Sequence, residues 1–170
     1  MFSKRKPSLR RLILLALYGA LIFAVQTAMA SIPNINATST LIIALTLAYS
    51  WQALYAVAVY VLLEGLSFGF GIWWLSYLYI WTIPVALTVL FRKKEGRLFW
   101  ALLAGLFGVT FGALCTLPYF FIDGFRAALS YWLNGISFDL LHGAGNFAVT
   151  FLLLPPLRRA LAAGKGTETH

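Results

Sequence analysis

The chain has 170 residues, of which 61% are hydrophobic, 16% aromatic and only 11% charged. A soluble domain carries about 25% charged residues, so a soluble fold of this length could not bury so much apolar surface. A spanning helix needs about 20 residues, which leaves room for at most six or seven passes and for no separate soluble domain. The composition therefore predicts a single integral membrane domain.

The charge is strongly basic, with 13 Lys and Arg against 5 Asp and Glu, a net charge of +8. In a soluble protein this balance would indicate nucleic-acid binding. Here all the basic residues except Arg126 flank apolar runs: five precede the first run, four lie at 92–97 and three follow the last run. Such flanks report the orientation of membrane helices, so we expect no nucleic-acid partner.

Turn or polar residues divide the chain into six apolar runs. These runs cover 12–30, 35–49, 53–71, 73–91, 98–121 and 136–157. With six passes both termini lie on one side, and 12 of the 13 basic residues fall on the cytoplasmic side. We therefore expect an all-α integral membrane protein, a compact bundle of six transmembrane helices with both termini cytoplasmic.

The first run has an alternative interpretation. Basic residues, an apolar stretch and Ala28-Met29-Ala30 also fit a secretory signal with an A-x-A cleavage site. The stretch is long enough to span a membrane, so we interpret it as a retained first helix. The expected organisation is a basic cytoplasmic N-terminus over 1–11, one membrane domain over 12–160 and a flexible cytoplasmic tail over 161–170.

Small residues repeat every four positions in two of the runs. In the first run they are Ala16, Ala20, Ala24 and Ala28. In the fifth run they are Ala104, Gly108 and Gly112. A stripe of small side chains lets another helix backbone approach closely. For the fifth run we favour packing within the chain, whereas the first stripe fits internal packing and docking of a partner protein about equally well.

Polar side chains gather in the outer half of the predicted bundle. Glu64 lies near the middle of the third run, where a charged group costs at least about 2.5–3.5 kcal/mol. Asp139 and His142 share a face at the start of the sixth run, and Asn146 lies one turn deeper. Each has a structural alternative: a buried carboxyl for Glu64, a helix cap for Asp139 and a core histidine for His142. Their convergence predicts a binding site.

Aromatic residues and a loop point to the same region. Trp73, Tyr77 and Trp81 follow at intervals of four in the fourth run, too deep for an interfacial belt alone. They predict the wall of a pocket for a flat or apolar ligand, with plain core packing as the alternative. Asn34 and Asn36 lie in the first outer loop, where they could be turn residues or part of a lid.

Motifs for chemistry are missing from the sequence. It contains no G-x-x-x-x-G-K-[ST] and no H-E-x-x-H or G-x-S-x-G, and its lone Cys115 forms no internal disulfide. We therefore expect no ATPase motif, no catalytic residues, no metal and no cofactor. Two other classes stay open: a membrane-embedded enzyme using Asp139 and His142 in acid–base chemistry, and a ligand-free assembly protein.

The chain resembles the substrate-binding S components of energy-coupling factor (ECF) vitamin transporters. The resemblance covers almost the whole span region. It is carried by Ala16-x-x-x-Ala20-x-x-x-Ala24, Ile32-Pro33-Asn34, Leu63-Glu64-Gly65-Leu66 with Gly69-Phe70-Gly71-Ile72-Trp73-Trp74, and Phe138-Asp139-Leu140-Leu141-His142-Gly143 running to Pro156-Leu157.

The resemblance implies a transport subunit in a bacterial or archaeal cytoplasmic membrane. Such a subunit captures a micronutrient from outside and works with a transmembrane coupling subunit and two cytoplasmic ATPases. Ala16, Ala20 and Ala24 would dock the coupling subunit. The expected substrate site consists of Asn34, Asn36, Glu64, Trp73, Tyr77, Trp81, Asp139, His142 and Asn146.

Overall fold

The computed structural model describes residues 7–32 and 34–166. Residues 1–6 of the expected basic N-terminus, Pro33 of the first loop and residues 167–170 of the expected tail lie outside the described residues. All the secondary structure within the described ranges is helical. The protein is therefore all-α, in agreement with the expected class.

Six α-helices and one short 3₁₀ helix make up the described chain. They are α1 (Leu9–Ala28), α2 (Thr38–Tyr49), η1 (Ser50–Gln52), α3 (Ala53–Phe68), α4 (Ile72–Ile80), α5 (Thr82–Leu90) and α6 (Arg97–Gly166). Ser8 caps α1, because its Oγ accepts a 3.3 Å hydrogen bond from the backbone N–H of Arg11. Glycines with positive φ, Gly69 (φ 89°) and Gly96 (φ 92°), mark the turns after α3 and before α6.

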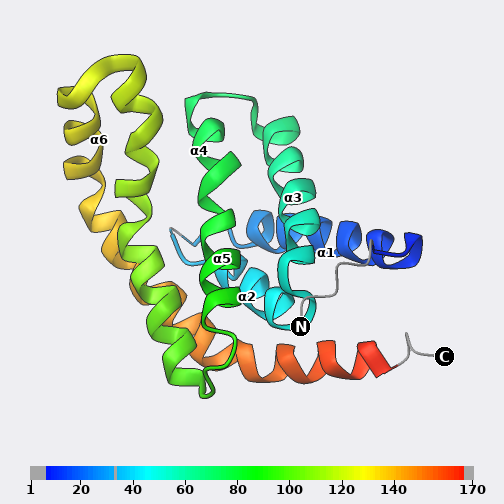
Figure 1. The fold of residues 1–170 in the computed structure, drawn as a ribbon. Coiled ribbons are helices and arrows are strands. Elements are labelled where there is room, and N and C mark those ends of the chain that lie inside the picture. Colours follow the sequence, from blue (N-terminus) through cyan, green and yellow to red (C-terminus); the bar gives the residue numbers. More distant parts are fainter. Residues whose placement is uncertain (1–6, 33, 167–170) are drawn as a thin grey trace.

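The element α6 is a hairpin of two helical arms. Its backbone leaves the helical region at Gly124, with φ 84° and ψ 177°. The chain reverses there, and the two arms run side by side (Figure 1). We call 97–123 the first arm and 125–166 the second arm. The sequence predicted a break between the runs that end at 121 and begin at 136, but helix fills this segment apart from Gly124 and continues as far as Gly166.

Within the described residues, four segments are long and apolar enough to cross a membrane, whereas the sequence predicted six. They are Leu9–Ala28, Thr38–Phe68, Ile72–Leu90 and Arg97–Gly164. The count differs because α2 has only 12 residues and continues through η1 into α3, and because both predicted last runs belong to α6. The long apolar helices indicate a membrane location.

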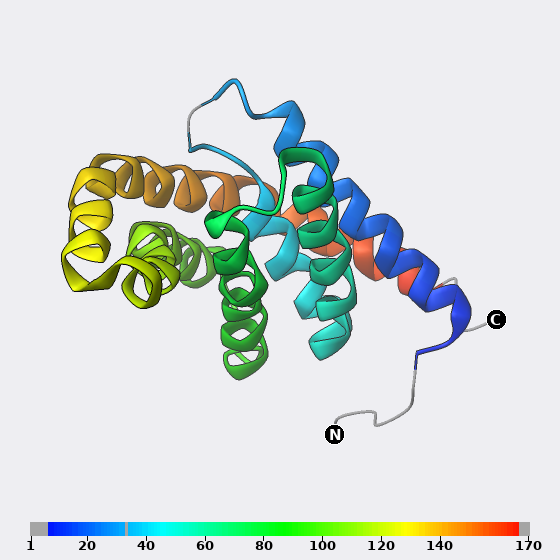
Figure 2. The same ribbon diagram turned by 90° about the horizontal axis from the view of Figure 1, so that it is seen from above.

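The helices pack around α2, which is buried from Thr38 to Thr46. The second arm of α6 and α5 pack against α2, and α4 packs against α6. Figures 1 and 2 show α1 lying across α3. The two helices meet at Gly19, where a Cβ would lie 2.9 Å from Val59 Cβ and would clash with the carbonyl oxygen of Ala56. Gly19 therefore sets the close approach of α1 to α3.

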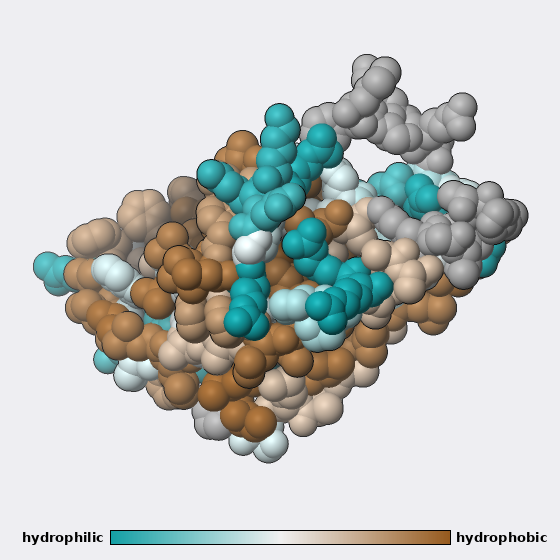
Figure 3. Space-filling view, turned by 90° about the horizontal axis from the view of Figure 1, so that it is seen from below, coloured by the Kyte–Doolittle hydropathy of each residue, from teal (hydrophilic) through white to brown (hydrophobic). Residues whose placement is uncertain are grey.

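Large apolar side chains cover much of the outer surface. Leu9 and Phe121, for example, are about three-quarters exposed. The face seen from below is largely apolar, with a group of hydrophilic residues near its centre (Figure 3). Such a surface would be a liability in water but suits helices in contact with lipid.

Candidate functional site

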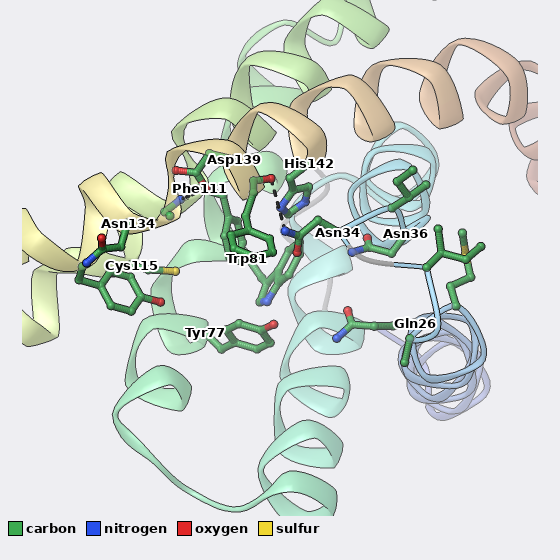
Figure 4. A pocket seen from close by; sticks show the side chains of 18 residues that line it. Gln26, Asn34, Asn36, Tyr77, Trp81, Phe111, Cys115, Asn134, Asp139 and His142 are labelled. Atoms are coloured by element: carbon green, nitrogen blue, oxygen red, sulfur yellow. Dashed lines mark hydrogen bonds between the residues drawn. The ribbon is translucent and has the colours of Figure 1, made fainter.

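A cavity of about 640 Å³ opens between the α1–α2 loop, the α4–α5 segment and both arms of α6 (Figure 4). Its volume falls within the range of small-molecule sites, about 300–1,000 Å³. Six of the nine residues predicted to bind substrate line it: Asn34, Asn36, Tyr77, Trp81, Asp139 and His142. The fold thus brings together residues that are far apart in the sequence.

Aromatic rings form one wall of the cavity. The Trp81 ring packs against Tyr77 and Phe111, each with ring centroids 5.5 Å apart, and the side chain of Trp81 is only 1% exposed. The Phe111 ring in turn lies 4.9 Å from the His142 ring. We call these four residues the aromatic wall. Such a surface suits a flat ring, which can pack edge-to-face or offset-stacked against it.

The third predicted aromatic residue, Trp73, lies outside the cavity lining. Its ring packs edge-on against Tyr77, with centroids 5.1 Å apart. Trp73 therefore packs against the aromatic wall without lining the cavity. This is the core packing that the sequence analysis gave as the alternative for these aromatic residues.

Within the aromatic wall and next to it lie buried polar atoms that no other described residue satisfies. Asp139 Oδ1 accepts a 2.9 Å hydrogen bond from the backbone N–H of Gly112, but Asp139 Oδ2 has no partner within the described chain. The same holds for His142 Nε2 and for Trp81 Nε1. A buried polar group without a partner costs about 1–3 kcal/mol. A polar ligand in the cavity that paired with these atoms would remove this cost.

Asn146 lies one turn below His142 and outside the cavity lining. Its side chain is fully buried, and neither amide atom has a hydrogen-bond partner in the part of the chain that the structure describes. A Cβ on Gly108 would lie 2.9 Å from Asn146 Nδ2. Asn146 thus extends the polar group below the cavity, packed against the first arm of α6.

Glycines on the first arm hold the polar side chains in place. A Cβ on Gly108 would lie 2.7 Å from Gly143 Cα, so the two arms touch through their backbones. A Cβ on Gly112 would lie 2.6 Å from Asp139 Oδ1 and closer still to Oδ2. The small-residue row of the fifth run therefore packs within the chain, and the absence of a side chain at Gly112 leaves room for the Asp139 carboxyl.

Glu64 lies behind the cavity and does not line it. Its Oε1 accepts a 3.0 Å hydrogen bond from Gln26 Nε2, and Gln26 itself lines the cavity. Gln26 Oε1 accepts hydrogen bonds from Thr38 Oγ1 at 2.9 Å and from the Tyr60 hydroxyl. Sequence analysis missed Gln26; the signal was an amide side chain within an otherwise apolar run.

The α1–α2 loop closes one side of the cavity. Asn34, with a positive φ of 55°, donates a 3.4 Å hydrogen bond from Nδ2 to the carbonyl oxygen of Phe138 on the second arm. Asn36 Oδ1 accepts a 3.1 Å hydrogen bond from the N–H of Thr38 at the start of α2. Asn36 thus holds the turn before α2, as one interpretation of the sequence expected, and it also lines the cavity.

The alanine stripe of α1 turns away from α3 along its length. Ala16 and Ala20 are half-buried, whereas Ala24 and Ala28 are exposed. The contact with α3 is made instead at Leu15, Gly19 and Ile22, the buried residues of α1. The outer part of the stripe is therefore an exposed surface of small residues.

Sequence analysis also missed residues of the first arm. Phe111 and Cys115 line the cavity, and Phe107 packs against Trp81 with centroids 5.9 Å apart. Their spacing of four residues places them on one helical face, a signal that the sequence contained. Cys115 is buried and also forms part of the cavity lining.

Within residues 7–32 and 34–166, no three His, Cys, Asp or Glu side chains gather as a metal site would require. The cavity combines the aromatic wall with hydrogen-bonding groups at one end. Comparison with known proteins finds no matching family model, no matching curated protein and no matching solved structure.

Proposed function

We propose that this protein is the substrate-binding S component of an ECF-type importer. In this role it captures a vitamin or related micronutrient from outside and delivers it inward with a transmembrane coupling subunit and two cytoplasmic ATPases. The observation that supports the proposal most is the 640 Å³ cavity with the unpartnered buried atoms of Asp139 and His142 beside an aromatic wall. The assignment to this class of transporter rests on the family resemblance and on the residues quoted for it in the sequence analysis.

The proposed topology is six passes with both termini cytoplasmic. Counting α2 and α3 as separate spans, α4 and α5 together as one span, and the two arms of α6 as two spans gives six passes with α1. This count puts the basic residues at the N-terminus, at 92–97 and after 157 on one side, as the positive-inside rule requires. We place the protein in a bacterial or archaeal cytoplasmic membrane.

The lining residues also favour one kind of substrate. The 18 residues around the cavity include a carboxyl group, Asp139, but no lysine or arginine. A buried anion needs a cationic or multiply hydrogen-bonded partner. The substrate in this proposal is therefore a flat aromatic ring system, neutral or cationic, whose edge pairs with Asp139 and His142 and whose face packs on Trp81 and Phe111.

Mass spectrometry of small molecules released from the detergent-purified protein tests the proposal. The expected result is one organic compound near one per protein, together with ATPase subunits in the purification of the natively expressed protein. Turnover of a lipid-linked substrate would replace the proposal with an enzyme. An empty protein that binds no small molecule and associates tightly with itself would replace it with an assembly protein.

A further inference from the structure

A second pocket, of about 540 Å³, shares no lining residue with the cavity described above. Four basic side chains line it. Arg92 and Lys93 come from the turn after α5, and Arg158 and Arg159 come from the second arm of α6. We call this the basic pocket. The fold thus brings two pairs of cations from distant parts of the sequence to one hollow.

The rest of the basic pocket is apolar. Its remaining lining residues are Ala44, Leu47, Ala48, Leu161 and Ala162, of which the first three belong to α2. None of the nine lining residues is an acid. Directly beside it in the chain, Leu90 at the end of α5 is 71% exposed. The pocket therefore has two parts: a basic rim, formed by the four cationic side chains, and an apolar floor, formed by the other five lining residues. An apolar outer surface lies next to it.

Cationic side chains around one hollow attract an anion that lies between them. The planar guanidinium groups of Arg158 and Arg159 match the oxygens of a phosphate group, which they can bind in a bidentate manner. A basic pocket between helices at the end of membrane spans is suited to an anionic lipid head group. The apolar floor favours a ligand that also carries acyl chains over a small hydrated anion.

We propose that the basic pocket binds the phosphate group of an anionic phospholipid, with the acyl chains along the neighbouring apolar surface. Nothing in this proposal depends on the substrate cavity, because the two pockets share no lining residue. The proposal holds for a transporter subunit, an enzyme or an assembly protein alike.

Native mass spectrometry of the full chain in detergent tests the proposal. The delipidated protein is mixed with equal amounts of dioleoylphosphatidylglycerol and dioleoylphosphatidylcholine, and the bound fraction of each lipid is measured. We expect preferential retention of phosphatidylglycerol. The double variant Arg158→Gln/Arg159→Gln should weaken that retention at least tenfold, because it removes two of the four basic groups that attract the anionic lipid.

A charge-matched variant supplies the control. Arg10→Gln/Lys94→Gln removes the same charge from two exposed residues outside the pocket, and it should keep the lipid preference. Arg92→Gln/Lys93→Gln removes the charge from the other pair of basic residues and should also weaken the retention of phosphatidylglycerol. This second variant keeps the test valid if the first variant does not fold. Equal losses in the pocket and control variants, or equal retention of both lipids, would overturn the proposal.

A soluble probe separates lipid from free phosphate. Glycerol 3-phosphate carries the head-group phosphate without acyl chains. We expect it to compete for the pocket at least tenfold more weakly than the lipid. Competition at the same concentration as the lipid would overturn the lipid assignment in favour of a soluble phosphate compound.

Discussion

The side-chain amide of Gln26 on α1 donates a 3.0 Å hydrogen bond to the carboxyl of Glu64 on α3. The carbonyl oxygen of the same amide accepts from Thr38 Oγ1 on α2 and from the Tyr60 hydroxyl on α3. One side chain therefore connects three helices next to the substrate cavity. Because Gln26 also lines that cavity, the network links the packing of α1 to the shape of the site.

Gln26→Leu should destabilise the protein while keeping the volume of the side chain similar. The substitution leaves Glu64, Thr38 and Tyr60 without the partner that Gln26 supplies, and each unsatisfied buried group costs about 1–3 kcal/mol. Thermal unfolding in detergent measures the loss. Thr27→Leu, at the exposed neighbouring position, is the control and should change stability by no more than about 0.5 kcal/mol. Equal stability of the two variants would show that the network contributes nothing.

Gly112→Ala should displace the Asp139 carboxyl. The added methyl group would lie within 2.6 Å of Asp139 Oδ1, so the hydrogen bond from the Gly112 N–H cannot keep its length. We expect the variant to fold with reduced stability and to lose ligand to a similar extent as Asp139→Ala. Binding is measured as the amount of small molecule retained per protein.

Gly135→Ala is the control for that substitution. Gly135 also lines the cavity and lies in the second arm, but a Cβ there would have no heavy atom within 4 Å among the described residues. It should therefore retain stability. If Gly112→Ala bound ligand as well as Gly135→Ala did, the position of the Asp139 carboxyl would not matter for binding.

His142→Leu should weaken ligand binding at least tenfold, about 1.4 kcal/mol. The reason is that His142 Nε2 is a buried atom that finds no partner elsewhere in the described chain, so a ligand is the partner it would gain. Thr110→Val on the first arm is the control, because the Thr110 hydroxyl bonds only to backbone carbonyls of its own helix, at Leu106 and Phe107. Isothermal titration with the compound identified by mass spectrometry measures both. Unchanged affinity in His142→Leu would show that His142 does not contact the ligand and that the polar end of the site lies elsewhere.

Local periodicity made part of this site predictable. Tyr77 and Trp81 are four residues apart, as are Phe107 and Phe111, and such spacing places side chains on one helical face whatever the fold. Asp139 and His142 were found in the same way. What periodicity cannot show is which faces meet. The contacts of Trp81 with Phe111 and of Gly112 with Asp139 join residues from different helices, and these depend on the packing of the whole chain.

Turn signals were less reliable than periodicity. Asn134-Gly135 is a common turn sequence, and it predicted the end of a loop, but the second arm of α6 is helical through both residues. Only Gly124 adopts a positive φ in that region. Within a long apolar helix the backbone hydrogen bonds have no competition from water, so a local preference for a turn is overridden. Glu64 illustrates the same limit, because its partner Gln26 lies on another helix, α1, which local periodicity cannot identify.

Gly19→Ala should destabilise the contact between α1 and α3. A methyl group at this position would meet the carbonyl oxygen of Ala56 and lie 2.9 Å from Val59 Cβ, so α1 must move away from α3. Helix association in a membrane depends on such close approach. Thermal unfolding should show a loss of about 1–3 kcal/mol, the usual cost of overpacking. A variant as stable as the original protein would show that α1 adjusts freely.

Ala24→Trp addresses the other side of the same helix. Ala24 is exposed, so the larger side chain should leave folding and the binding of small molecules unchanged. If the exposed part of the alanine stripe docks a coupling subunit, as the family resemblance implies, the variant should bind ligand but lose uptake into cells. Leu17→Trp, which also replaces an exposed α1 residue but lies outside the alanine stripe, is the matched control and should lose less uptake. Loss of ligand binding in Ala24→Trp, with normal folding, would contradict a docking role for this surface.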